Sequence, residues 1–269
     1  MVNDAKQAPI GVFDSGIGGL TVVRSLLRRL PNESLIYVGD TARVPYGPKS
    51  PETVRRYAAQ IADWLVLEGV KAIVVACNTA TAHALTYLQQ HLTIPVIGVV
   101  EPGARAAVRA TRGGPIGVIG TAGTINSGAY ARAIHALAPA VEVRQQACAL
   151  LVPLVEEGWL DHAATKVIVQ EYLAPLQRAQ VDTLVLGCTH YPLLATVIAE
   201  EMGRFVPLID SGEETASETA RILDERHLLQ SRGPAVHRFV ASDAPEKFLL
   251  LARQFLPNAI TNVEHVAFA

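Results

Sequence analysis

The chain has 269 residues, of which 50% are hydrophobic and 18% are charged, and its 25 acidic side chains nearly balance its 23 basic ones. This composition is typical of a folded globular protein and excludes a disordered chain. The length suits one large domain or two smaller ones with a substantial core. A net charge of -2 without a cluster of basic residues argues against nucleic acid or a membrane surface as a partner, so we expect a small-molecule ligand.

The N-terminal stretch lacks the long apolar core of a signal peptide, and the longest apolar runs are far shorter than the roughly 20 residues of a membrane helix. We therefore expect a cytoplasmic protein. The three cysteines, Cys77, Cys148 and Cys188, form no CxxC pair and are odd in number. This pattern fits neither a disulfide framework nor a closed zinc cluster, so we expect free thiols and no metal site.

Short β-branched segments alternate along the chain with longer segments of helical periodicity. This alternation is typical of βα units around a parallel sheet. The clearest helix follows the second predicted strand: Ser50 can cap it, Pro51 suits its first position and Gly69 ends it. The predicted strands span residues 10–14, 34–39, 71–76, 95–99, 116–120, 141–146, 183–187, 206–209 and 236–241.

A weak internal repeat indicates two related halves. The strands at 10–14 and 116–120 both begin with Ile-Gly-Val and run into small residues, and two later strands each deliver a cysteine, Cys77 or Cys188, to their carboxyl end. Ligands of open parallel sheets bind beyond the carboxyl ends of the strands. We therefore predict an α/β protein of two similar domains with mainly parallel sheets and an active-site cleft between them.

The half-repeat also predicts the domain limits. We expect the first domain to comprise residues 1–98 and 210–269, and the second to comprise residues 99–209. The last segment is assigned to the first domain because a predicted helix at 211–230 and the strand at 236–241 have the composition to extend its sheet.

The glycine-rich loop from Asp14 to Thr21 opens a helix after a strand, and Asp40 ends the next strand, as in a dinucleotide site. However, Thr21 replaces the third glycine of the GxGxxG spacing, and Asp14 would bring negative charge to the pyrophosphate. The loop amides could instead hold a carboxylate, or the loop could be a tight turn without a ligand. No lysine lies at the carboxyl end of a predicted strand, which argues against a pyridoxal cofactor.

Two thiols at one pocket favour acid–base chemistry at a carbon atom. Cys77 and Cys188 lie among Asn, Thr and His, and such a setting can lower the pKa of a thiol toward neutrality. One thiol could remove a proton while the other supplies one to the opposite face, whereas Cys148, in an apolar stretch, is interpreted as core. Two other interpretations stay open. One is a protein that binds an amino acid without turnover, and the other is a hydrolase that uses Cys188, His190 and Glu157.

Six sequence blocks, in order, closely resemble those of bacterial glutamate racemases. They run from about residue 10 to residue 215, and the cysteine blocks alone would also fit an aspartate racemase of the same superfamily. The blocks are VFDSGIGGL from Val12, DTARVPYG from Asp40, ACNTA from Ala76, LVPLVEEG from Leu151, GCTHYP from Gly187 and LIDSG from Leu208.

The resemblance implies a cofactor-independent isomerase that interconverts L- and D-glutamate, supplies D-glutamate for peptidoglycan and forms a homodimer. Cys77 would act on D-glutamate and Cys188 on L-glutamate. Their catalytic auxiliaries would be Asp14, Glu157 and His190. The implied substrate contacts are Asp14, Ser15, Tyr46, Gly47, Asn78, Thr79, Thr189 and His190, with Thr121 as an addition.

Overall fold

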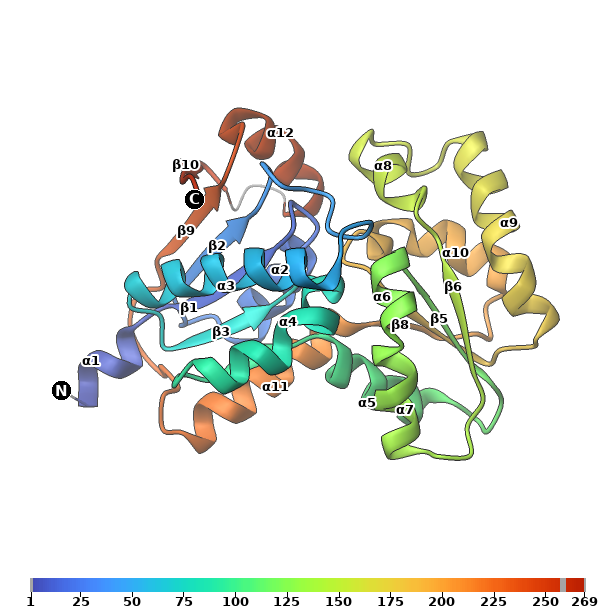
Figure 1. Cartoon of the computed structure of the whole chain (residues 1–269), viewed down its shortest axis with the longest axis horizontal. Coiled ribbons are helices and arrows are strands. Elements are labelled where there is room, and N and C mark those ends of the chain that lie inside the picture. The colour runs from blue at the N-terminus through green and yellow to red at the C-terminus, as the bar shows by residue number, and fades with distance from the viewer. Residues whose placement is uncertain (1, 257–259, 269) are drawn as a thin grey trace.

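The computed structural model describes residues 2–256 and 260–268 of the chain, and its strands form two parallel sheets that lie in the two halves of the molecule (Figure 1). The first sheet has the order β10-β9-β2-β1-β3-β4. It contains β1 (Ile10–Asp14), β2 (Leu35–Gly39), β3 (Ala72–Val75), β4 (Val96–Gly98), β9 (His237–Ala241) and β10 (Glu264–His265). The second has the order β6-β5-β7-β8. It contains β5 (Ile116–Gly120), β6 (Val143–Ala147), β7 (Thr183–Gly187) and β8 (Leu208–Asp210).

The nine predicted strands are confirmed, with boundaries that differ by a few residues at most. A tenth strand, β10, was not predicted from the sequence, because it pairs only Glu264 and His265 with β9. All of the strand pairs are parallel. The predicted α/β class with mainly parallel sheets is therefore confirmed.

The internal repeat is visible in the strand order. Four neighbouring strands of the first sheet, β2-β1-β3-β4, have the same arrangement as β6-β5-β7-β8 of the second. In this correspondence β3 is equivalent to β7, and these are the strands that precede Cys77 and Cys188. The two cysteines therefore occupy matching positions in two similar halves.

The helices follow the strands and cover both faces of each sheet. The clearest predicted helix is confirmed: Ser50 Oγ accepts a hydrogen bond from the Thr53 amide, and Gly69 beyond the helix end has φ +77°. The helices are α1 (Val2–Gln7), α2 (Leu20–Arg29), α3 (Pro51–Leu67), α4 (Asn78–His91), α5 (Val100–Ala110), α6 (Ala122–Ser127), α7 (Ala129–Leu137), α8 (Leu151–Glu156), α9 (Ala163–Arg178), α10 (Ala195–Met202), α11 (Ser211–Glu225) and α12 (Pro245–Phe255), with a 3-10 turn at Tyr191–Leu194.

Alternation of side chains along the strands divides the core of the first half into two layers. Val12 and Val74 share a cluster with apolar residues of α2, α11 and α12, whereas Phe13 and Val75 share another with residues of α3 and α4. In the second half, α5 and α7 contribute to the cluster on one face of the sheet, and α8, α9 and α10 to the cluster on the other. Each sheet is thus buried on both sides, as parallel sheets generally are.

The segment after β8 links the two halves. Helix α11 packs against α2 of the first half and α5 of the second, and β9 then pairs with β2. The helix ends at Glu225, earlier than the predicted 211–230, because His227 adopts φ +58°, which does not continue a right-handed helix. The domain limits at 98 and 210 stay a proposal. Among the described residues, no helix is long and apolar enough to cross a membrane.

Candidate active site

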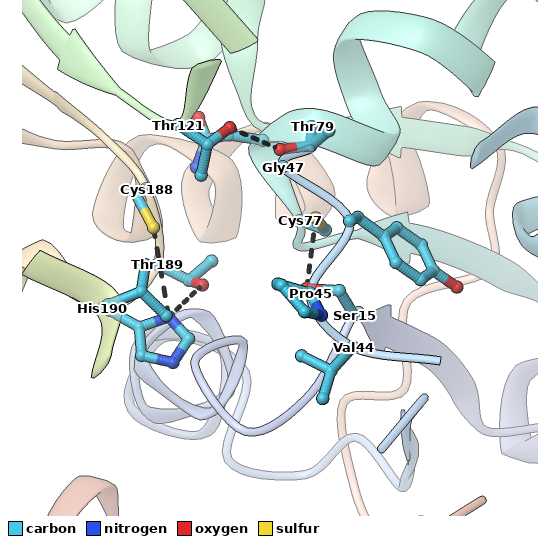
Figure 2. A pocket seen from close by; sticks show the side chains of 13 residues that line it. Ser15, Val44, Pro45, Gly47, Cys77, Thr79, Thr121, Cys188, Thr189 and His190 are labelled. Carbon is cyan, nitrogen blue, oxygen red and sulfur yellow. Dashed lines mark hydrogen bonds between the residues drawn. The ribbon is translucent and has the colours of Figure 1, made fainter. Parts of the chain in front are cut away.

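The two strand-end cysteines lie at one pocket between the halves (Figure 2). Cys77 follows β3 and caps α4, where its Sγ accepts a hydrogen bond from the Ala80 amide at 3.4 Å. Cys188 directly follows β7. Each cysteine is 6% exposed, and Figure 2 shows their sulfur atoms on opposite sides of the pocket. The fold therefore brings the two thiols to a single site, one from each sheet.

Cys77 faces an acidic part of the first half. Its Sγ lies 3.7 Å from Ser15 Oγ. The buried carboxylate of Asp14 accepts a hydrogen bond from the Gly16 amide at 3.1 Å through one oxygen, and its other oxygen has no partner among the described residues. Burial, and then the charge of Asp14, raise the pKa of the Cys77 thiol to about 12, while burial raises the pKa of Asp14. At neutral pH Cys77 is therefore a protonated thiol.

Cys188 faces a cationic group instead. His190 is buried, with Nδ1 3.9 Å from Cys188 Sγ and Nε2 3.1 Å from Glu156 Oε1. Burial by itself would lower the pKa of His190, but its hydrogen bonds to Cys188 and Glu156, together with nearby negative charge, raise this pKa to about 10. The ring of Phe255 from α12 packs edge-on against the imidazole at a centroid distance of 5.8 Å. His190 thus places a positive charge beside the sulfur of Cys188.

The acidic partner of His190 is Glu156, one residue before the glutamate that the resemblance implied. Glu156 ends α8 and is partly buried, whereas Glu157 is the C-cap of that helix and is exposed. Successive helical residues point about 100° apart, so only one of two neighbours can face the imidazole. Glu156, and not the expected Glu157, is therefore the glutamate that contacts His190.

Hydroxyl and amide side chains complete the polar lining of the pocket. Asn78 Oδ1 accepts a hydrogen bond from the Tyr130 hydroxyl at 2.7 Å, which leaves its buried Nδ2 without a partner among the described residues. Thr79 and Thr121, from different halves, have their hydroxyl oxygens 2.8 Å apart. Such donors are suited to a carboxylate ligand. The pocket lining includes every predicted substrate contact except Asp14, namely Ser15, Tyr46, Gly47, Asn78, Thr79, Thr189 and His190, with Thr121.

The loop of residues 41–50 after β2 forms one wall of the pocket. It reaches the second half at Gly47, whose carbonyl oxygen accepts a hydrogen bond from the Gly123 amide at 2.9 Å. A Cβ at position 47 would lie 2.9 Å from Thr121 Cβ, so this approach requires glycine. The pocket residues of the loop are Val44, Pro45, Tyr46 and Gly47.

The glycine-rich loop after β1 is explained by a second close approach between the halves. A Cβ at Gly18 would collide with the side chains of Thr189 and His190. The Thr21 hydroxyl donates a hydrogen bond to the Thr189 carbonyl oxygen at 3.1 Å. The loop therefore packs directly on the residues that follow Cys188, where the dinucleotide interpretation would have required space for a pyrophosphate.

The third cysteine is a core residue, and the described residues hold no cluster that could bind a metal ion. Cys148 is fully buried in the apolar cluster of the second half, which confirms its interpretation as a core residue. Within residues 2–256 and 260–268, no three His, Cys, Asp or Glu side chains gather as a metal ion would require.

Sequence reasoning missed two kinds of site residue. Val44, Pro45 and Val152 line the pocket, but apolar side chains carry no chemical signal that distinguishes them from core residues. Glu156 was passed over because its neighbour Glu157 has the same side chain. The helical position of each glutamate relative to the pocket is the signal that separates them, and it depends on how α8 packs.

The fold and the pocket define a class of protein in which two similar α/β halves each present one thiol to a shared, polar, buried site. A family model described as Asp/Glu/Hydantoin racemase matches residues 10–219. The chain is 54% identical over 259 residues to a glutamate racemase of Geobacter metallireducens, a match that covers 96% of each chain.

Two solved structures extend the similarity to the whole fold. A glutamate racemase of Bacillus anthracis superposes with a TM-score of 0.94 at 45% identity, over 97% of this chain and 98% of that one. A glutamate racemase of Francisella tularensis in complex with D-glutamate gives a TM-score of 0.92 at 40% identity, over 98% of each chain. The chain belongs to the Asp/Glu/hydantoin racemase family and, within it, to the glutamate racemases, which confirms the resemblance found in the sequence.

Proposed function

We propose that the protein interconverts L- and D-glutamate without a cofactor, with Cys77 and Cys188 as the two acid–base groups. The observation that carries this proposal is the placement of two buried thiols at equivalent strand ends, on opposite sides of one pocket. A two-base inversion at a carbon uses a base on one face and an acid on the other, and this arrangement supplies both. The D-glutamate in the Francisella tularensis structure supports glutamate as the ligand.

The proposed reaction exchanges one proton for another at the α-carbon. A thiolate removes the α-proton and becomes a thiol, while the opposite thiol protonates the other face and becomes a thiolate. The high pKa of Cys77 favours a protonated thiol there, and we infer that the imidazolium beside Cys188 assists that residue as the base. This ionisation suits L-glutamate, with Cys188 as its base and Cys77 as the acid that yields D-glutamate.

The α-proton of glutamate is a weak acid, so the negative charge that develops must be stabilised by donors at the α-carboxylate. Asn78 Nδ2 is buried and has no protein partner among the described residues, and the Ser15 and Thr189 hydroxyls line the same pocket. Their hydrogen bonds are stronger in a buried site than in water. We infer that these groups hold the carboxylate and stabilise its charge.

The auxiliary groups differ between the two thiols. We infer that Asp14 accepts or relays a proton beside Cys77 through its unpaired oxygen. We infer that His190 stabilises the thiolate of Cys188, with Glu156 fixing the imidazole through its 3.1 Å hydrogen bond. In both cases the role is to keep each thiol in the protonation state that its next proton transfer needs.

We further propose that the product D-glutamate enters peptidoglycan synthesis. A bacterial strain that requires external D-glutamate tests this role: expression of the protein should restore growth without the supplement, whereas a Cys77→Ser variant should not. Assembly as a homodimer and a cytoplasmic location stay predictions, which size-exclusion chromatography with light scattering and cell fractionation would test.

The activity itself is tested by following the circular dichroism of L-glutamate incubated with pure, dialysed protein. We expect the signal to decay to zero, and persistent optical activity would contradict the proposal. In deuterium oxide, early turnover should place deuterium in the product and leave the recovered substrate unlabelled, because separate groups remove and supply the proton. Equal early labelling of substrate and product would indicate a single base.

Two other activities are separated by parallel assays. An aspartate racemase would invert L-aspartate faster than L-glutamate under the same conditions. A cysteine hydrolase would form an acyl-enzyme on Cys188 and would not require Cys77.

A further inference from the structure

Asp40, which the sequence places at the end of the second strand, has no part in the proposed chemistry and does not line the pocket. It is nevertheless completely buried. A buried carboxylate is costly unless it is fully paired, so its partners indicate what it does. Three side chains donate hydrogen bonds to it. Two of them belong to the loop of residues 41–50, and the third belongs to a segment that is hydrogen-bonded to the start of this loop.

The first donor is Arg43, within the loop. Its Nε lies 3.0 and 2.8 Å from the two oxygens of Asp40, and its Nη1 donates to Gln60 Oε1 at 2.5 Å. The guanidinium carbon stacks 4.1 Å from the centre of the Tyr57 ring and 5.3 Å from that of Phe268. Arg43 is therefore held on several sides, and it fixes the start of the loop to Asp40.

The second donor is Tyr46, whose hydroxyl bonds to Asp40 Oδ2 while the residue lines the pocket. Its neighbour Gly47 accepts the Gly123 amide from the opposite half. The carboxylate of Asp40 is thus hydrogen-bonded to a residue of the pocket wall. Through this bond it fixes the segment that contacts α6 of the other half.

The third donor is Ser242, which directly follows β9 and donates to Asp40 Oδ1 at 2.8 Å. Its hydroxyl also accepts from the Ala42 amide at 2.9 Å, and its own amide donates to Gly39 O at 3.1 Å. Next to it, Thr41 and Asp243 exchange two hydrogen bonds. A remote segment of the chain is thereby attached to the base of the loop.

We propose that Asp40 is a positioning residue for the reaction: it fixes the wall formed by Tyr46 and Gly47 against the substrate. This inference rests on the proposed function. Both reacting thiols lie on other elements, after β3 and β7, so loss of the Asp40 carboxylate leaves them in place and loosens the wall alone. The substrate constant KM should therefore change more than kcat.

The test is Asp40→Asn, which keeps the size of the side chain but turns one acceptor into a donor that faces Arg43 and Tyr46. We expect KM for both enantiomers of glutamate to rise at least tenfold and kcat to fall less than threefold. Hydrogen exchange read by mass spectrometry should show lost protection in the peptides that contain residues 41–50 and Gly123.

Asp182→Asn is the matched control. Asp182 accepts from the Thr111 hydroxyl at 2.8 Å and from the Arg112 and Gly114 amides at 2.8 and 2.9 Å, but it precedes β7 at the end of the sheet away from the pocket. We expect this variant to lower the thermal transition and to leave KM within twofold. An equal rise in KM in both variants would overturn the proposal, because it would indicate general loosening.

A folded Asp40→Asn protein with unchanged KM and unchanged protection at Gly123 would also overturn it. If that variant does not fold, Ser242→Ala decides, since it removes only one hydroxyl, which donates to Asp40 and accepts from the Ala42 amide. We expect a two- to threefold rise in KM, and no change in KM or in exchange would refute the proposal. If the wild-type protein does not racemise glutamate, the proposed function fails, but the exchange measurements still decide whether Asp40 positions the loop.

Discussion

The two sides of the pocket are built from equivalent strand ends, yet they place opposite charges beside their thiols. Cys77 has Asp14 and the Ser15 hydroxyl as neighbours, whereas Cys188 has the imidazole of His190. Their exposure is the same, 6% each, so burial alone cannot distinguish them. The difference lies in the neighbouring charges: after burial, the charge of Asp14 further raises the pKa of Cys77, whereas Cys188 has the cationic imidazole of His190 beside it.

This comparison teaches that a duplicated fold does not require duplicated chemistry. The end of β1 carries Asp14, while the equivalent strand β5 ends in Gly120 and is followed by Thr121, whose hydroxyl contacts Thr79. The cation beside Cys188 comes from a residue two positions after it, and the first half has Thr79 at that offset. The repeated strands thus place two thiols alike, and single residues around them give the two thiols different charged neighbours.

The largest expected effect is the loss of either reacting thiol. A serine hydroxyl is far less acidic than a thiol, so Cys77→Ser and Cys188→Ser should each lower kcat for racemisation by about 10²–10⁴-fold. The circular dichroism assay measures this loss. Cys148→Ala is the control, because this third thiol is buried in the core, and it should retain kcat within about threefold. Full racemisation by either serine variant would refute the two-thiol mechanism.

The next largest effect should come from the cation beside Cys188. His190→Gln removes the charge but keeps a hydrogen-bonding side chain, and we expect kcat/KM to fall about 10²-fold. The fall should be equal from L- and D-glutamate, because two enantiomers have the same free energy in water and the ratio of the two constants is therefore fixed. Steady-state kinetics in both directions checks this, and an unchanged kcat/KM would show that the thiolate needs no imidazolium.

A smaller effect separates the two neighbouring glutamates of α8. Glu156→Gln replaces a charged hydrogen bond to His190 by a neutral one, which should cost about 1–1.5 kcal/mol and lower kcat about tenfold. Glu157→Gln changes an exposed cap residue and should leave kcat within about twofold. The same assay on the two variants decides between them, and a greater loss in Glu157→Gln would restore the role that the resemblance implied.

The smallest effect is on stability. The pKa of His190 is raised from its ordinary value near 6.5 to about 10, so protonation of the imidazole stabilises the folded state below pH 6.5 and this contribution is lost as the pH rises toward 10. The thermal transition of the wild-type protein should therefore fall between pH 7 and 10 by a few °C more than that of His190→Gln. Differential scanning calorimetry of both proteins measures this difference, and parallel curves would show that His190 is neutral.

Much of the fold followed from the sequence because its signals are local. The nine strands that the sequence predicted have short β-branched segments bounded by turn residues, and Ser50, Pro51 and Gly69 set the limits of α3. The signal that places Cys77 and Cys188 at strand ends is equally local, because each strand ends where its run of apolar residues ends. The brief pairing of β10 with β9 had no such signal.

The amino-acid sequence by itself determined the α/β class, the two related halves and the residues at the ends of their strands, because hydrophobic periodicity and turn chemistry act within a few residues. Only the tertiary structure decided that Glu156 rather than Glu157 meets His190, and that Asp40 is paired with Ser242 from the far end of the chain. Both outcomes depend on how elements remote in sequence pack together. A side chain's partners are fixed by that packing, which no local pattern encodes.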